Sequence, residues 1–182
     1  RAFMGTRTTS VIVPDDNPWN LVIGLGAFED CLYIAEMTLP FIGASLDDVK
    51  ISWFGYIFGA GASNANHTYV PESLKRLVFN EGMQVIGDSA FYGLSSLEEV
   101  VLPESITTLY PNAFQNTRFS YEFKNPIATV SGAGRLRYVA TKSHFNKNVK
   151  GHITLADGVT EIDEYTFAYG YVLGEDKPNL TG

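Results

Sequence analysis

Acidic pairs and three histidines are the side chains of this sequence that could act in acid–base catalysis or bind a metal. The acidic pairs lack the D-x-D-x-D-G spacing of a calcium-binding loop, and the histidines lack the HxH or HxxxH spacing of a zinc site. No nucleophile stands beside a base. We therefore predict no catalytic residue, no metal site and no cofactor. The residues considered are Asp15-Asp16, Asp47-Asp48, Glu98-Glu99, Asp163-Glu164, His67, His144 and His152.

Cys31 is the single cysteine, so the sequence predicts no internal disulfide and no cysteine-based metal site. It lies three residues after Phe28, at a position that other repeats fill with a small or apolar residue. This pattern favours a buried thiol that packs as a small hydrophobic side chain. The alternative is a reactive nucleophile, for which no histidine lies at a motif spacing.

Aromatic side chains are concentrated between positions 53 and 58, where Trp53, Phe54, Tyr56 and Phe58 occur. Exposed rings can form a platform for a sugar or a peptide, whereas buried rings would fill an oversized repeat. The same part of the chain continues with polar and aromatic residues suited to recognition. The candidate partner-binding residues here are Trp53, Tyr56, His67 and Tyr69.

A second candidate surface follows from alternation in the expected strands. Residues on either side of the central apolar position point away from the core, and stacked parallel strands would align them into columns. Arg76 and Glu99 are the candidate partner-binding residues of this face, although a solvated sheet without a partner is the alternative. The two columns are Glu36, Arg76, Glu99 and His152, and Thr38, Val78, Val101 and Thr154.

These side chains are positioned by a repeat of 23 residues, best seen between positions 74 and 114. Leu74, Leu77 and Phe79 recur as Leu97, Val100 and Leu102, and Ala90-Phe91 recurs as Ala113-Phe114. Apolar residues two apart indicate a strand, and the following Asn80-Glu81-Gly82 or Pro103-Glu104 ends it. A fixed period of this length is typical of a solenoid. We expect Phe28, Phe91, Phe114 and Phe167 to stack in its interior.

Other stretches vary the same unit. Residues 10–13 are expected to form a strand, and the pattern returns between 153 and 167. Alternating aromatics at 119–123 predict a strand, and 128–131 with 135–139 flank a glycine-containing turn that predicts a hairpin. Lys142 to Lys150 reads as a polar, basic loop, with a binding patch as the alternative.

One unit carries an insert. Leu39 and Phe79 are 40 residues apart where 23 are expected, so about 17 residues are added. Phe58 is expected to hold the interior ring position. Ser45 and Asp48 predict a helix from Leu46, and 59–67 predicts a flexible loop. The added residues are expected to protrude or overhang and, together with Arg76 and Glu99, to form the binding region.

Length and composition restrict the function further. The chain has 182 residues, 17 glycines, 8 prolines and 13% aromatic residues, which suits a turn-rich β fold. The net charge of −7 disfavours nucleic acid as a partner. No run of 18 apolar residues is present, which disfavours direct membrane insertion of this segment.

Several motifs resemble the bacterial BspA-like leucine-rich repeat family. They are Ile-Gly-x-x-Ala-Phe-x-x-Cys at 23–31, Leu-Pro-Phe-Ile-Gly at 39–43, Phe-Gly-Tyr-Ile-Phe-Gly at 54–59, Val-Pro-Glu-Ser-Leu at 70–74 and Leu-Pro-Glu-Ser-Ile-x-x-Leu at 102–109. Thr6 and Thr117 stand where the first motif has Cys. The resemblance implies a secreted or cell-surface leucine-rich-repeat solenoid, often used for adhesion, with no catalytic residues.

The expected fold is therefore mainly β with short helical turns. Residues 1–182 are expected to form a single leucine-rich-repeat solenoid of about five 23-residue units, one of them with the long insert, and to belong to a longer array. The expected function is a non-enzymatic protein-interaction or adhesion module of a bacterial surface or secreted protein. The alternatives are a glycan-binding module that uses the aromatic insert, and a structural spacer for another domain.

Overall fold

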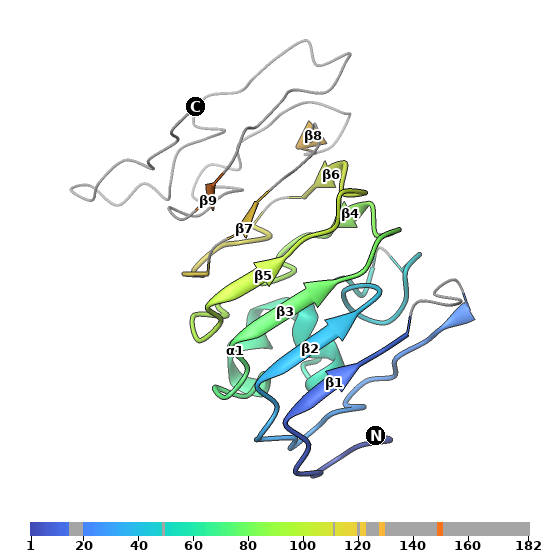
Figure 1. Cartoon of the computed structure of the whole chain (residues 1–182), viewed down its shortest axis with the longest axis vertical. Coiled ribbons are helices and arrows are strands. Elements are labelled where there is room, and N and C mark those ends of the chain that lie inside the picture. Colours follow the sequence, from blue (N-terminus) through green and yellow to red (C-terminus); the bar gives the residue numbers. More distant parts are fainter. Residues whose placement is uncertain are drawn as a thin grey trace, which may run out of the picture.

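A computed structural model describes residues 1–14, 20–48, 50–110 and 112–119 in full, and the backbone of 121–122, 128–129 and 149–150. The chain winds into stacked coils, and each coil adds one strand to a parallel sheet (Figure 1). The strands of this main sheet lie in the order β1-β2-β3-β5. Their bounds are Ser10–Ile12 for β1, Glu36–Leu39 for β2, Arg76–Phe79 for β3 and Glu99–Val101 for β5.

The register of the main sheet follows the repeat. Met37 pairs with Leu77, and Leu77 pairs with Val100, so equivalent residues of successive units lie side by side. All three side chains are buried in the core, while their neighbours along each strand point outward. The strands predicted at these positions, and the one predicted at residues 10–13, are thus confirmed.

A second parallel sheet was not predicted from the sequence. It contains β4 (Val85–Ile86), β6 (Thr108–Leu109) and β8 (Ala128–Thr129), in that order. The backbone of β7 (Tyr121–Glu122) pairs in parallel with that of β9 (Val149–Lys150), and β7 follows β5 in the stack (Figure 1). The predicted hairpin and basic loop lie mostly outside the described residues.

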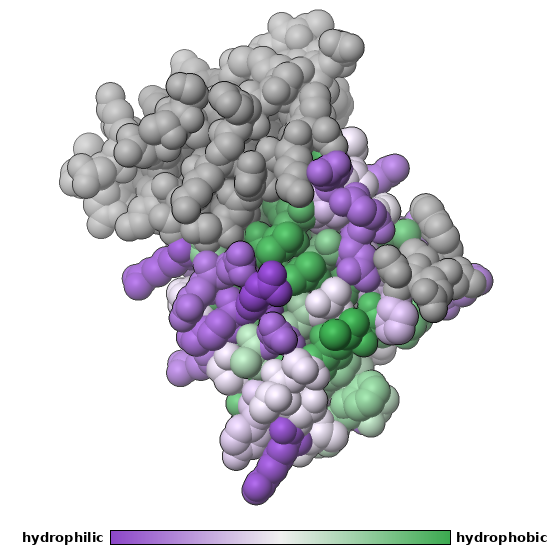
Figure 2. Space-filling model, viewed as in Figure 1, coloured by the Kyte–Doolittle hydropathy of each residue, from purple (hydrophilic) through white to green (hydrophobic). Residues whose placement is uncertain are grey.

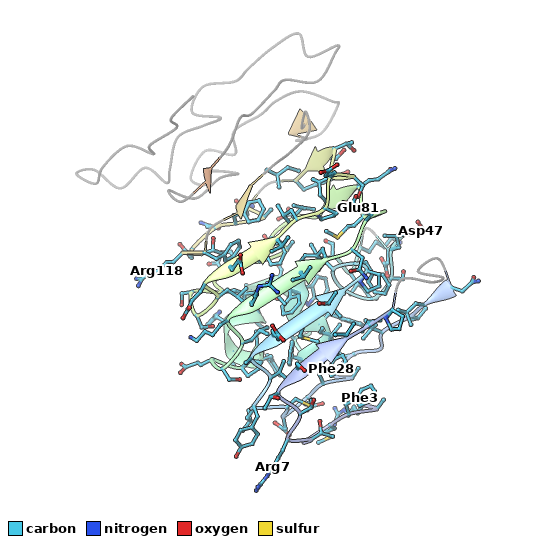
Figure 3. All side chains as sticks on the ribbon, viewed as in Figure 1. Phe3, Arg7, Phe28, Asp47, Glu81 and Arg118 are labelled. Carbon is cyan, nitrogen blue, oxygen red and sulfur yellow. The ribbon has the colours of Figure 1, made fainter. Side chains whose placement is uncertain are left out.

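Phenylalanine rings form a column inside the coils. Phe91 and Phe114 are one repeat apart, and their ring centroids lie 5.6 Å apart with the planes 9° from parallel. Phe3 stacks on Phe28 in the same way at 5.2 Å, at the N-terminal end of the stack (Figure 3). Phe167, also predicted for this column, lies outside the described residues. Because neighbouring coils share this ring stack, each coil is stabilised by the coils beside it.

The insert continues the column with two rings instead of one. A 3-10 helix, η2 (Phe54–Phe58), holds both rings in the core. The Phe58 ring lies 6.2 Å from Phe28 in the preceding unit, and the Phe54 ring lies 6.3 Å from Phe91 in the following unit. The prediction that Phe58 occupies the interior position is therefore confirmed toward one neighbour, and Phe54 occupies it toward the other.

Left-handed backbone recurs at the corners of the coils. The residues two before and two after the interior phenylalanine have positive φ, which lets the chain reverse on both sides of the ring. Non-glycine residues hold several of these corners, and Asn and Asp tolerate that conformation better than most. The corners are Gly26 and Asp30, Ser89 and Gly93, and Asn112 and Asn116.

Two predictions about the insert were wrong. In place of a helix from Leu46 there is a turn, in which Asp48 Oδ1 accepts hydrogen bonds from the backbone N–H groups of Lys50 (2.8 Å) and Ile51 (3.1 Å). In place of a flexible loop at 59–67 there are η3 (Ser63–Ala65) and the one-turn helix α1 (Asn66–Tyr69). The carboxylate of Asp48 satisfies the turn locally, which competes with helix formation.

Candidate interaction surfaces

The outward side of the main sheet carries a row of charged side chains. Glu36, Arg76 and Glu99 occupy paired positions on β2, β3 and β5. Arg76 Nε lies 2.6 Å from Glu99 Oε2, and Arg76 Nη1 lies 4.0 Å from Glu36 Oε2. All three side chains are about half exposed to solvent. The register therefore confirms the predicted column, except for His152, which lies outside the described residues.

A less polar row runs beside it. Ile12, Thr38, Val78 and Val101 occupy the paired positions two residues further along each strand. Ile12 is 76% exposed, and the other three are half-buried. Figure 2 shows this face as a hydrophilic area next to a hydrophobic one. Such a surface can offer a partner hydrogen bonds from one row and apolar contact from the other.

The charges of this face are only partly balanced. Arg76 lies between two glutamates, so the row carries one excess negative charge. A second, longer contact joins Lys75 Nζ to Glu98 Oε1 at 3.8 Å, and these two residues directly precede β3 and β5. Exposed pairs of this kind contribute little to folding, which leaves them available for a partner.

The aromatic insert separates into buried and accessible rings. Phe54 and Phe58 are 0% and 1% exposed and fill the coil, so they belong to the core. Trp53 and Tyr56 are half-buried and contact each other edge to face, with centroids 6.1 Å apart. Trp53 Nε1 also donates a hydrogen bond to the Ala60 carbonyl at 2.9 Å, which fixes the indole. Of the four aromatic side chains at 53–58, Trp53 and Tyr56 are therefore the ones accessible to a ligand.

The remaining candidate residues lie on α1. His67 and Tyr69 are exposed, with His67 against Gly93 and Tyr69 against Gly59. Figure 1 shows α1 and η2 behind the main sheet, whereas Arg76 and Glu99 point to the opposite, outward side. The structure thus brings Arg76 to Glu99 and Trp53 to Tyr56, but it places these two pairs on different layers of the coil.

Asn66 is a residue whose role was not predicted from the sequence. It is fully buried, and its Oδ1 accepts the Gly55 N–H at 2.7 Å. Its Nδ2 donates to the carbonyls of Ser89 (3.3 Å) and Ala90 (3.2 Å) in the next unit. Nothing in the sequence distinguishes it from the exposed Asn64 two positions earlier. Asn66 fixes the insert to the repeat stack.

In the described part of the chain, no group of three or more His, Cys, Asp or Glu side chains could hold a metal ion. Cys31 is 1% exposed, and its thiol donates to the Phe3 carbonyl at 2.9 Å, as expected for a buried packing residue. No helix among the described residues is both long and apolar enough to cross a membrane.

Comparison with known proteins gives one match. A family model described as the BspA type leucine-rich repeat region matches residues 65–169, with six copies of the repeat. The match includes the stretch 118–150, where the repeat is hardest to see by eye. Searches of curated proteins and of solved structures find no match.

Proposed function

This chain belongs to the BspA-type leucine-rich repeat family, and from that premise we propose that residues 1–182 form one solenoid that acts as a protein-interaction or adhesion module. Leucine-rich repeats of this family suggest a protein-interaction or adhesion role, and the family is generally non-enzymatic. We further propose that the module belongs to a bacterial surface or secreted protein, because proteins of this family are typically found there.

The main support is the outward face of the main sheet. Aligned rows from β1, β2, β3 and β5 make a continuous strip, and additional repeats would lengthen it in register. Extended faces of this kind bind partners over many small contacts. The strip combines the Glu36, Arg76 and Glu99 charges with the apolar Val78 and Val101, which suits a protein surface.

A glycan is the second candidate ligand. Trp53 and Tyr56 are accessible and adjacent, and the indole orientation is fixed by its hydrogen bond to Ala60. Such a pair could stack against a sugar ring. His67 and Tyr69 would extend this surface on the same layer. The pair is small, however, because Phe54 and Phe58 are committed to the core.

Binding assays on the full chain test the proposal. The 182-residue chain is immobilised and exposed to a panel of extracellular-matrix and plasma proteins, and separately to a glycan array. We expect at least one protein of the panel to bind. Arg76→Glu combined with Val78→Lys should weaken that binding at least tenfold, which corresponds to about 1.4 kcal/mol. Gln84→Lys is the control, because Gln84 is exposed, as Arg76 is, but lies outside the strip.

The alternatives give different results. Glycan binding that is lost in Trp53→Ala and kept in the strip variant would favour the glycan module. Binding to neither panel would favour a spacer. A protein ligand whose affinity is the same for the strip variant and for Gln84→Lys would overturn the assignment to the strand face.

A further inference from the structure

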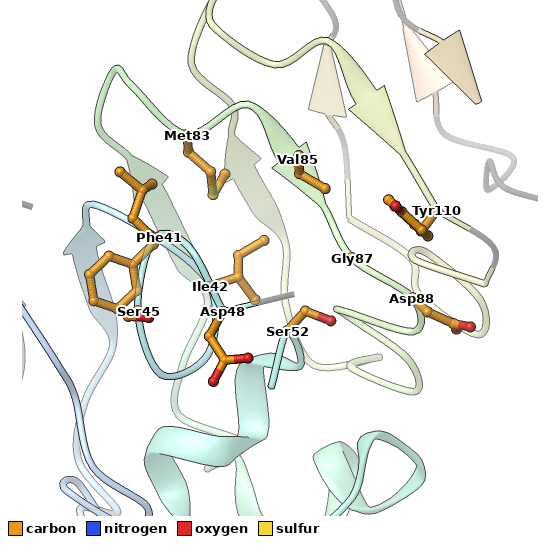
Figure 4. A pocket seen from close by; sticks show the side chains of 11 residues that line it. Phe41, Ile42, Ser45, Asp48, Ser52, Met83, Val85, Gly87, Asp88 and Tyr110 are labelled. Carbon is orange, nitrogen blue, oxygen red and sulfur yellow. The ribbon is translucent and has the colours of Figure 1, made fainter. Parts of the chain in front are cut away.

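A pocket of about 310 Å³ lies between the insert and the second sheet. Its walls come from three consecutive units, with Phe41 and Ile42 after β2, Met83 and Val85 at β4, and Tyr110 after β6. Figure 4 shows these side chains around a common space. Phe41, Ile42 and Met83 are buried, so the interior of the pocket is apolar. Its volume is within the range of small-ligand sites.

Two carboxylates line the same pocket. Asp48 uses Oδ1 to accept the Lys50 and Ile51 N–H groups, and Asp88 uses Oδ1 to accept the Ser89 hydroxyl at 2.6 Å. Figure 4 shows the two carboxylates at opposite ends of the pocket, with Asp88 on the side of Tyr110. Within the described part of the chain, neither carboxylate forms an ion pair. Each therefore keeps one oxygen, Oδ2, for a ligand.

The backbone of β4 adds a third feature. The N–H groups of Thr108 and Tyr110 donate to the carbonyls of Gln84 and Ile86. Successive residues of a strand point their backbone groups to opposite sides, so the N–H and C=O of Val85 point away from β6. β4 is an end strand of its sheet, and no residue within 1–14, 20–48, 50–110 and 112–119 bonds to these two groups. Such an edge can accept an added strand.

We propose that this pocket binds a lysine or arginine side chain carried by an extended segment of a partner protein. The aliphatic stem lies against Ile42 and Met83, and the cationic head reaches the free oxygen of Asp88. The Tyr110 ring offers a further cation–π contact. A chain with a net charge of −7 attracts a basic partner over longer distances.

The Val85 edge is the reason for choosing a peptide over a free amine. An extended segment can form main-chain hydrogen bonds to Val85 and place one side chain into the pocket, as in other strand-addition complexes. This inference rests on the proposed function, because it names the chemistry of a partner for a protein-binding module. It uses a different surface from the strip at Arg76, so the two can fail separately.

The probe is the peptide acetyl-Val-Lys-Val-amide, titrated into the 15N-labelled 182-residue chain and followed by NMR. We expect the Val85 and Gly87 amide signals to shift, and the affinity to fall with added salt. The norleucine analogue keeps the aliphatic stem but lacks the charge. It should bind about tenfold more weakly, because a hydrogen bond to a charged group contributes a factor of about ten or more to affinity. n-Butylamine should also bind about tenfold more weakly, because it lacks the peptide groups.

Matched variants locate the site. Asp88→Asn keeps an acceptor for Ser89 but removes the charge, and should weaken the lysine peptide about tenfold. Asp47→Asn removes an exposed carboxylate next to Asp48 that does not line the pocket, and should leave the affinity unchanged. Val85→Phe should fill the pocket and abolish binding, with urea unfolding used to show that the variant is folded.

Each opposite result overturns the inference. Equal binding of the norleucine peptide would show that charge is not recognised, and equal binding of n-butylamine would show that the ligand is a free amine. An unchanged affinity in Asp88→Asn would place the cation elsewhere. Arg76→Ala should not affect the peptide. Unchanged protein binding in the strip variants, with the peptide still bound as expected, would therefore reject the strip alone.

Discussion

The regular units and the insert unit hold their neighbours in different ways. Between regular units, two backbone hydrogen bonds join the coils at the interior ring, from Phe91 N to Ala113 O (2.8 Å) and from Gly93 N to Gln115 O (2.9 Å). The same two bonds join Phe3 and Gly5 to the unit of Phe28. The repeat thus reproduces its own coupling, because equivalent residues always meet.

The insert unit has only part of this ladder. Phe54 N donates to Ala90 O at 2.9 Å, as a regular phenylalanine would. The second backbone bond is missing, because Tyr56 N is bonded within η2 to Trp53 O. The Asn66 side chain takes over, with bonds to the Ala90 and Ser89 carbonyls. Where the backbone loses its register, a buried amide supplies the connection.

The insert also depends on close contacts that the regular units do not need. A Cβ on Gly87 would overlap with the Ser52 side chain, and a Cβ on Gly43 would overlap with the Ile51 carbonyl. The regular units are therefore fixed by periodicity, and the insert by individual side chains. Outside its core, the insert should therefore tolerate fewer substitutions per residue than the regular units. Four experiments test this difference between the two regions.

The largest effect is expected at the interior rings. Among the described residues, Phe91 contacts the rings of Phe54, Phe79, Phe114 and Phe119, whereas Phe58 contacts those of Phe28 and Phe54. Phe91→Ala should lower the free energy of unfolding by about 3–5 kcal/mol. Phe58→Ala should lower the free energy of unfolding by less, because the Phe54 ring remains at the interior position. Urea unfolding of the full chain measures both, and an equal or larger loss for Phe58→Ala would contradict the two-ring arrangement.

The next effect is at the polar anchor. Asn66→Ala leaves the Gly55 N–H without its acceptor, and the Ala90 and Ser89 carbonyls lose a donor. An unsatisfied buried group costs about 1–3 kcal/mol, so the variant should lose about 3 kcal/mol. Asn64→Ala is the control: its side chain is exposed, and the change should stay within about 0.5 kcal/mol. Similar losses for both would mean that α1 is not anchored by Asn66.

The difference between the regions also sets what could be predicted from sequence. Strand positions, their register and the ring column follow from the 23-residue period, and the structure confirms them wherever it describes them. The second sheet was missed, because β4 and β6 are two residues long and give no alternating pattern. In the insert, Phe58 alone was expected at the interior ring position, because a repeat offers a place for one ring.

The candidate sites divide along the same line. The Glu36, Arg76 and Glu99 row follows directly from the repeat. The pocket does not, because it joins the turn around Asp48 to Asp88, 40 positions later, through a contact that no local pattern encodes. Within the insert, His67 and Tyr69 are exposed, whereas Ala60 and Asn66 are fully buried, and no sequence pattern separates the two groups. The Gly87 contact with Ser52 is equally invisible in the sequence.

That contact gives the third prediction. Gly87→Ala should cost about 2 kcal/mol, because the new methyl group would overlap with Ser52 and overpacking costs about 1–3 kcal/mol. Ser52→Gly should restore part of this loss when it is combined with Gly87→Ala. Gly24→Ala is the matched control, since no atom lies within 4 Å of its Cβ position. A Gly87→Ala loss that Ser52→Gly does not relieve would show that the insert packs on β4 through other atoms.

The smallest effect is expected on the outward face of the regular strands. Arg76 and Glu99 form a 2.6 Å ion pair, but both side chains are about half exposed, and pairs of this kind contribute about 0.2–1 kcal/mol. A double-mutant cycle with Arg76→Ala and Glu99→Ala should give a coupling near 0.5 kcal/mol that decreases at 1 M salt, where screening shortens electrostatic range to about 3 Å. Lys75→Ala with Glu98→Ala is the weaker comparison pair, because its atoms lie 3.8 Å apart. A coupling above about 2 kcal/mol would mean that this row helps to hold the coils together. A small coupling means that the row contributes little to folding, so its charges can be changed to test partner binding without unfolding the protein.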